Sequence, residues 1–562
     1  MLLAAPLLAQ TADGDLDPSF GVGGKVQHDF GQSTDIAHAV AAQPDGKLVV
    51  VGTTYTNNDY SKEDFAVLRL LADGSPDPSF GIAGRVKTDF PGLAAVASSV
   101  VVQPDGKILV AGGAFPLFTF LGDFKLVRYN ADGSLDASFG TGGIVTTVFP
   151  GQGSYAFALA LQPDGRIVAA GTDFVNFSSS SSSNTDFALA RYHPDGTPDA
   201  TFGINGQLAT DFDGFNDDAF AVLVQPDGKL VAVGSAVSTA NFYDFAAARY
   251  LQNGALDSSF GTGGKVRTDF GTGGFDQARS AALQTDGKVV AAGFTNFNFG
   301  LSQPFALVRY DASGALDATF DGDGKAEIDF GSFNQTAYKV LLPPGGKIVT
   351  VGYPNTESSD SDFLVARSHP DGSLDTSFGI GGKVRTSFGD LNGGAQGAAL
   401  LPDGRIVAAG FNATPTHEFS QFAVARYIGF GIVPVPGCFA NPAALAALSS
   451  KAVLGVTFDL SLSSSQIATG LAVLHLGFDG TDAAGCGLFA PGLGELLLSL
   501  APAPPQVGLG SLSSGSIAFA VPVPPQTALL GMQVALQGAV AGVSDPGLPV
   551  ELSNALLVTI TQ

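Results

Sequence analysis

Few residues in this sequence have the types and spacing that catalysis requires. The chain holds six histidines and contains no Gly-x-Ser-x-Gly elbow, phosphate-binding loop or HExxH helix. His193 and His369 occupy the same turn position in two similar segments, where other segments carry Asn130 or Asp311. Both histidines are therefore predicted to be turn residues rather than general bases. Because no catalytic motif is present, we assign no catalytic residues and predict that the protein is not an enzyme.

Residues that could hold a metal ion or form a disulfide are equally few. Asp321 and Asp323, in the segment DGDG, interrupt the repeat described below and could hold a cation. The segment lacks the ligand spacing and the terminal glutamate of an EF-hand, so we expect no cofactor and keep calcium as the alternative. Cys438 and Cys486 are compatible with one disulfide, with two free buried thiols as the alternative. Without nearby histidines they do not make a zinc site.

The overall charge excludes one large class of partners. Acidic residues number 51 and basic residues 27, which gives a net charge of −24. Such a chain repels the phosphate backbone of nucleic acids and anionic lipid surfaces. No apolar run is long enough to predict a membrane span. Residues 1–11 contain a short apolar run and are typical of the end of a secretory signal, with a frayed apolar N-terminus as the alternative. We therefore expect a secreted or cell-surface protein.

The elements that must position any site come from one unit that occurs seven times. Turns similar to QPDGK recur every 58 to 63 residues, and their basic residues are Lys47, Lys107, Arg166, Lys229, Lys288, Lys347 and Arg405. Each unit contains four short β-segments separated by Gly, Pro and Asp, and four strands per repeat define a propeller blade. We predict an all-β fold: a seven-bladed β-propeller followed by a smaller C-terminal β-sandwich-like domain.

An arginine and an aspartate keep a spacing of eight residues in these units. The pairs are Arg69 and Asp77, Arg128 and Asp136, Arg191 and Asp199, Arg249 and Asp257, Arg309 and Asp317, and Arg367 and Asp375. The turn between them should set each arginine opposite its aspartate across a hairpin. Arg426 has no such aspartate downstream, whereas Asp17 follows an N-terminal turn with no arginine before it. We predict that Asp17 pairs with Arg426 and closes the ring, because an open ring leaves unpaired strand edges.

The repeated motifs resemble a known family. QPDGK, DFALARY, DGSLD and SFGxGGKV together are similar to the delta-60 repeat family, and this resemblance, over residues 12–430, implies a bacterial β-propeller. After a linker at 431–437, residues 438–562 are expected to form a separate β-domain. Its GCFANP opening at Gly437 and its SNALLVTI ending at Ser553 resemble the C-terminal β-modules of exported planctomycete proteins. That resemblance implies an anchoring or sorting role.

The sequence favours recognition over chemistry. Loops at one place in the units differ in length and content, TTYTNNDYSKE in one and GAFPLFTFLG in the next, and variable loops on a rigid ring are where recognition is expected. We predict a monomeric, non-catalytic binding protein or cell-surface scaffold for a protein or glycan ligand. The alternatives are a propeller hydrolase or lyase acting on a polysaccharide and a purely structural envelope protein. Non-repeating acids, histidines or tyrosines at the channel would favour the enzyme; one residue type repeated seven times would favour the scaffold.

Overall fold

The chain consists of two units in this computed structural model, Met1–Phe430 and Gly431–Gln562. The structure describes the strands of the second unit and residues 12–429 of the first, apart from gaps at 32, 57–62, 117–120, 177–183, 239–241, 272–273, 296–302, 333, 355–360, 390–392 and 414–418. Every described element is a β-strand. Among these residues no helix has the length and apolar character needed to cross a membrane. The prediction of an all-β protein is confirmed.

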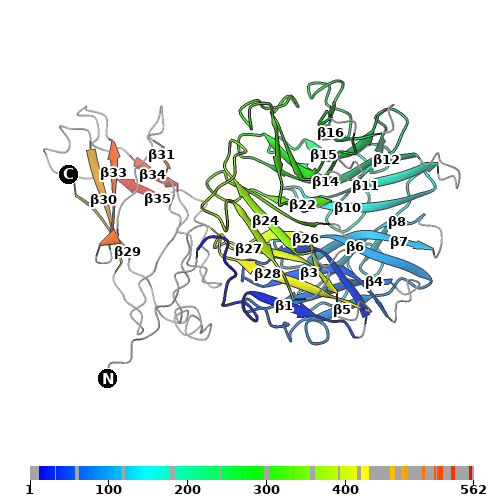
Figure 1. The fold of residues 1–562 in the computed structure, drawn as a ribbon, viewed down its shortest axis with the longest axis horizontal. Helices are drawn as coiled ribbons and strands as arrows, with labels where there is room; N and C mark the ends of the chain where they lie inside the picture. The colour runs from blue at the N-terminus through cyan, green and yellow to red at the C-terminus, as the bar shows by residue number, and fades with distance from the viewer. Residues whose placement is uncertain are drawn as a thin grey trace. The chain divides into compact units, whose positions relative to one another are not determined.

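The first unit is a β-propeller of seven four-stranded antiparallel sheets (Figure 1). Blades one and two contain β2 (Ser33–Ala42), β3 (Leu48–Thr56), β4 (Glu63–Leu70), β5 (Arg85–Thr88), β6 (Leu93–Val102), β7 (Ile108–Pro116), β8 (Asp123–Tyr129) and β9 (Ile144–Thr147). Blades three and four contain β10 (Gly153–Leu161), β11 (Ile167–Asn176), β12 (Asn184–Tyr192), β13 (Gln207–Thr210), β14 (Asp217–Val224), β15 (Leu230–Val237), β16 (Tyr243–Tyr250) and β17 (Lys265–Thr268). Blades five and six contain β18 (Gln277–Leu283), β19 (Val289–Phe294), β20 (Phe305–Tyr310), β21 (Lys325–Ile328), β22 (Gln335–Leu341), β23 (Ile348–Pro354), β24 (Phe363–Ser368) and β25 (Lys383–Thr386). Blade seven contains β26 (Gly393–Leu400), β27 (Ile406–Ala413), β28 (Ser420–Tyr427) and β1 (Lys25–His28).

The second unit contains two small antiparallel sheets. One has the strand order β29-β30-β33-β32 and the other has the order β31-β34-β35. Their strands are β29 (Val456–Ser461), β30 (Leu471–Phe478), β31 (Leu497–Ser499), β32 (Leu512–Ser513), β33 (Ser516–Pro522), β34 (Gln533–Gln537) and β35 (Leu556–Thr559). Cys438 and Cys486 lie outside the described residues, so their disulfide stays a prediction.

The repeated turn and the apolar strand after it explain how each blade folds. In the first QPDGK turn, Gly46 adopts a φ of 82°, a left-handed conformation that glycine accepts without strain. The strand that follows is buried on both faces. Leu48 and Val50 pack against blade seven, whereas Val49 and Val51 pack against blade two. The strand must be apolar throughout because neighbouring blades cover both sides of its sheet.

N-terminal residues complete the seventh blade. β1 pairs with β28 in antiparallel register, with Val26 opposite Val424, so the first strand of the chain is the outermost strand of the last blade (Figure 1). Before β1, the Asp17 N–H donates to the Arg426 carbonyl oxygen at 2.8 Å. Arg426 Nε in turn donates to Asp17 Oδ2 at 2.7 Å. The two ends of the repeat array therefore share one sheet.

We expect Asp17→Asn to destabilise the propeller. The change leaves the buried Arg426 guanidinium, on a residue that is 1% exposed, without its counter-charge. Removing one partner of a buried ion pair costs about 3–5 kcal/mol. The melting temperature, measured by circular dichroism, should fall by roughly 5 °C or more. Asp89→Asn, at an exposed aspartate, is the control and should leave the melting temperature nearly unchanged. Equal melting temperatures for the wild type and Asp17→Asn would contradict closure through this pair.

Candidate functional site

The structure brings each arginine of the predicted pairs to its aspartate. The arginine Nε lies 2.7–2.8 Å from the aspartate Oδ2 in all seven blades. The pairs are Arg69 with Asp77, Arg128 with Asp136, Arg191 with Asp199, Arg249 with Asp257, Arg309 with Asp317, Arg367 with Asp375, and Arg426 with Asp17. The basic residue of the QPDGK-like turn lies 2.7–3.2 Å from the same carboxylate. Each buried carboxylate is thus held between two cations.

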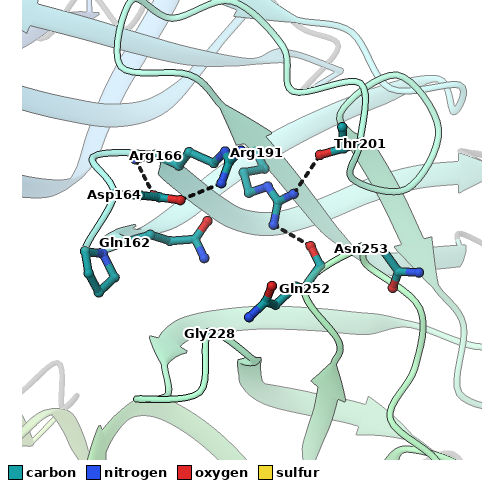
Figure 2. Close-up of a pocket in the computed structure, with 9 residues that line it drawn as sticks. Gln162, Asp164, Arg166, Arg191, Thr201, Gly228, Gln252 and Asn253 are labelled. Atoms are coloured by element: carbon teal, nitrogen blue, oxygen red, sulfur yellow. Dashed lines mark hydrogen bonds and ion pairs between the residues drawn. The ribbon is translucent and has the colours of Figure 1, made fainter.

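The arginine also ties neighbouring blades together, as Figure 2 shows for Arg191. Its Nη2 donates to Thr201 Oγ1 at 3.2 Å within blade three, and its Nη1 donates to the Gln252 carbonyl oxygen of blade four at 2.6 Å. The guanidinium carbon lies 4.6 Å from the ring centroid of Phe202. The equivalent arginines contact a phenylalanine in the same way in the other six blades. These arginines therefore hold the framework together rather than forming one unique site.

A crevice between blades three and four lies beside Arg191. Its volume is about 370 Å³. Asp164 and Arg166 of a QPDGR turn line one side, and Gln252 and Asn253 of the next blade line the other (Figure 2). These residues belong to the repeated turns and to the contacts of the Arg191 pair. The crevice is therefore a consequence of how blades meet and gives no reason for a ligand to choose this place.

The two aspartates predicted as alternative calcium ligands lie at a blade junction. Asp321 has a φ of 49°, and its N–H donates to the Asp371 carbonyl oxygen at 2.7 Å, in a place where the first repeat uses Gly21. Asp323 Oδ1 accepts the N–H of Lys325 at 2.9 Å. Among the described residues, neither aspartate belongs to a group of three acidic, histidine or cysteine side chains close enough to share an ion. Their local contacts are those of turn residues.

The innermost strands carry a feature that differs from blade to blade. β2, β6, β10, β14, β18, β22 and β26 contact one another around the axis, and the labels of β6, β10, β22 and β26 lie near the middle of the ring in Figure 1. Each of these strands has a β-bulge directly after an alanine. The bulged residues, here called the channel ring, are His38, Ser98, Phe157, Phe220, Arg279, Tyr338 and Gln396. All seven are partly accessible while the alanines before them are buried, so the bulges turn these side chains toward the channel.

Neighbours in the channel ring contact one another. His38 Nδ1 lies 2.6 Å from Gln396 Oε1. Burial lowers the pKa of His38, although the hydrogen bond to Gln396 opposes this shift, so the imidazole is neutral at pH 7. The rings of Phe157 and Phe220 lie 4.8 Å apart, and the Arg279 guanidinium carbon lies 4.3 Å from the Phe220 centroid. The channel ring therefore combines an aromatic stretch that carries a cation with a neutral polar stretch.

Titratable side chains with shifted pKa values accompany the channel ring. Lys339 stands where the other blades have alanine, serine or glycine, and burial lowers its pKa although the side chain keeps accessible surface. Burial raises the pKa of Asp218, which lies two residues before Phe220. Burial also raises the pKa of Glu63 to about 7, and the charge of Glu63 acts on Tyr155. Shifts of this kind are typical of binding and catalytic sites.

Sequence reasoning missed the channel ring, although the sequence contains a signal for it. The segments IAHAV, VASSV, YAFAL, DAFAV, QARSA, TAYKV and GAQGA share an alanine and then one variable residue, followed by a small residue in six of the seven. Only the buried alanine is the same in all seven segments, so the packing of blades selects the alanine and does not select the residue after it. By the criterion given above, the channel lacks the sevenfold repetition expected of a scaffold, and its His38 and Tyr338 count in favour of the enzyme.

Comparison with known proteins supports the fold class. The family model described as "Domain of unknown function (DUF5122) beta-propeller" matches residues 43–80, 103–139, 162–202, 225–260, 284–320 and 344–378. The chain is a β-propeller repeat protein. The delta-60 assignment and the resemblance of the C-terminal part stay predictions. No curated protein is significantly similar to the chain in sequence.

Several solved structures are similar to the chain at low identity. Extracellular domains 1–2 of Drosophila Semaphorin 1a are 10% identical, over 71% of this chain and 87% of that one, with a TM-score of 0.36. An α-L-arabinanase of Penicillium chrysogenum, complexed with arabinobiose, is 12% identical, over 58% and 91%, with a TM-score of 0.37. A mutant NanB sialidase of Streptococcus pneumoniae is 11% identical, over 76% and 71%, with a TM-score of 0.35. Likeness at these identities concerns the fold alone.

The prediction that the chain is not an enzyme rested on the lack of familiar catalytic motifs, and it is wrong. The solved structures similar to the chain include glycan-acting enzymes, the arabinanase and the sialidase. A propeller without a familiar catalytic motif is therefore not excluded from catalysis. The fold does not establish catalysis either, because one fold carries many functions.

Acid should unfold the propeller. Burial alone would raise the pKa of Asp17, but hydrogen bonds from Ser19 and the charge of Arg426 lower it to about 2. The other six paired aspartates shift in the same direction. A carboxylate whose folded pKa lies below its unfolded value stabilises the fold above the unfolded pKa, and this stability is lost as the pH falls. The melting temperature should therefore fall steeply between about pH 4 and pH 2. A melting temperature that stays constant down to pH 2 would contradict this assignment.

Proposed function

We propose that the protein is an exported binding protein that takes a glycan at the mouth of its propeller channel. The observation that carries this proposal is the channel ring, where seven equivalent positions after a constant alanine hold His38, Ser98, Phe157, Phe220, Arg279, Tyr338 and Gln396. A scaffold that needed only stacked blades would tolerate one small residue at all seven. Variation at these positions supports selection by a ligand there.

The chemistry of the channel ring suits a polyhydroxylated ligand. Sugar rings pack an apolar face on aromatic side chains and present hydroxyl groups at their edges to polar side chains. Partly accessible Phe157, Phe220 and Tyr338 supply aromatic surface, and Tyr338 stacks on Tyr353 with the rings 9° from parallel. Gln396 supplies an amide, and Arg279 and Lys339 supply cations. The two cations would favour a glycan that carries carboxylate or sulfate groups.

The strand ends that flank the variable loops lie at one end of the propeller, where we propose that the ligand enters. The first residue of β2, Ser33, pairs with Thr56 at the end of β3, directly before the first variable loop. The same pairing places Leu93 opposite Pro116 in blade two. The strand ends that flank the variable loops therefore surround one end of the channel, whereas the QPDGK turns lie at the other end. Export is supported by the apolar opening segment at residues 1–11.

A hydrolase or lyase acting on a polysaccharide is the second candidate. The pKa of Glu63, raised to about 7, favours it, because a carboxylic acid that is partly protonated near pH 7 can donate a proton to a leaving group. Burial also raises the pKa of Asp218. A turnover assay separates this candidate from simple binding.

Glycan-array binding followed by calorimetry tests the proposal. With a glycan found on the array, Arg279→Gln and Tyr338→Ala should each weaken binding by about tenfold or more, because each removes a channel contact. Arg385→Gln, on the outermost strand β25, is the matched control and should bind as the wild type does. Incubation of the same glycan with the wild type, followed by product analysis, reports any cleavage.

Two results would overturn the proposal. Absence of binding and cleavage across acidic and neutral glycans would favour the structural envelope role. An equal loss of affinity in Arg385→Gln and in the two channel variants would place the ligand elsewhere. Melting temperatures of all three variants should accompany the binding data, so that a folding defect is recognised.

A further inference from the structure

Three carboxylates converge at the junction of blades three and four, away from the Arg–Asp pairs. Asp186 lies near the start of β12, Asp211 directly follows β13, and Asp217 is the first residue of β14. One carboxylate oxygen of each lies within 4.8 Å of the others. Asp173 on β11 is the cross-strand neighbour of Asp186 and adds a fourth carboxylate beside them.

Three of these four carboxylates have a buried oxygen atom with no hydrogen-bond partner among the described residues. Asp217 is 0% exposed; its Oδ2 accepts the Phe212 N–H at 2.6 Å, whereas its Oδ1 has no partner among the described residues. Asp186 Oδ1 and Asp173 Oδ1 are also buried and have no hydrogen-bond partner among the described residues. A buried carboxylate oxygen without a donor is costly, because the native fold normally supplies one. The arrangement is missing a positive or donating group.

The next blade junction holds a similar trio, Asp244, Asp269 and Asp276, in which both oxygens of the buried Asp276 have donors. There Asp276 replaces Asp217; its Oδ2 accepts the Phe270 N–H at 2.9 Å, and its Oδ1 accepts the Thr295 hydroxyl at 2.6 Å. Opposite Asp217 the corresponding residue is Ala236, which has no hydroxyl to donate. The missing donor is thus specific to the junction of blades three and four.

A third junction shows what a neutral side chain does at this position. Gln335 stands where Asp217 stands; its Oε1 accepts the Phe330 N–H at 2.7 Å, and its Nε2 donates to Asp329 Oδ1 at 2.6 Å. The amide thus bridges to the aspartate that corresponds to Asp211. Asp217 cannot make this bridge as a carboxylate.

The nearest basic side chains do not fill the gap. Lys265 Nζ donates to the Asp211 backbone carbonyl at 2.5 Å, and Arg267 Nη2 pairs with Asp213 Oδ2 at 3.0 Å. These contacts leave the buried Asp217 Oδ1 without a donor among the described residues.

We propose that Asp186, Asp211 and Asp217, with Asp173 beside them, form a calcium site. Calcium takes oxygen ligands at about 2.4 Å, so any two ligands of one ion lie no more than about 4.8 Å apart. The oxygen atoms of Asp186, Asp211 and Asp217 meet this limit. An ion there would join β12 and the residue after β13 in blade three to β14 in blade four. Asp218 follows Asp217 directly, so the same ion would fix the strand that carries Phe220 into the channel ring.

Calorimetric titration of the full chain with calcium, after treatment with a chelator, tests the proposal. We expect a bound ion and a melting temperature that rises by roughly 3 °C or more at millimolar calcium. Asp217→Gln, which copies Gln335, should fold, lose that ion and show no calcium-dependent rise. Asp276→Asn, at the satisfied junction, is the matched control and should keep the full calcium response.

The outcomes that would overturn the site are specific. A wild type whose melting temperature does not respond to calcium, or an Asp217→Gln variant that responds as the wild type does, would exclude it. If Asp217→Gln does not fold, Asp186→Asn replaces it with the same expectation. A calcium response that persists when glycan binding is lost supports the calcium site, because calcium binding reports on the junction of blades three and four and glycan binding reports on the channel ring.

Discussion

A buried arginine in each blade is the interaction on which the rest of the structure depends. Its guanidinium pairs with an aspartate of its own blade, lies against a phenylalanine and, for Arg191, donates to a carbonyl of the next blade. A guanidinium presents donors in several fixed directions, so one side chain can join a hairpin to its neighbour. The seventh arginine obtains its aspartate only from the N-terminal segment, and closure of the ring follows from that need.

Packing between the blades of the closed ring does not fix the residue types at its axis. Apolar strands such as Leu48–Val51 are constrained on both faces by neighbouring blades. The bulged residues of the innermost strands meet no such constraint, and they differ in charge, size and hydrogen-bonding capacity. The architecture thus separates stability, which comes from repeated contacts between blades, from the residues at the axis, to which we assign recognition in the proposed function.

Much of the fold could be predicted from the sequence because its determinants are local and repeated. The eight-residue spacing of Arg69 and Asp77 follows from the hairpin that joins them, and the unmatched Arg426 and Asp17 indicate each other by elimination. The channel ring could not be placed in this way. His38 and Gln396 are 358 residues apart in the chain, and they meet only because the ring closes and because bulges turn both side chains toward the axis. The cluster around Asp217 escaped prediction for a similar reason, since it joins strands of two blades.

Hydrogen exchange read by mass spectrometry tests ring closure most directly. The backbone amides of Lys25–His28 are paired with β28, as each outermost strand of the other blades is paired with its neighbour. The account predicts that these four residues exchange as slowly as β5, β9 and the other outermost strands. Rapid exchange of Lys25–His28 beside six protected outermost strands would show that the ring is open, and the account would then fail.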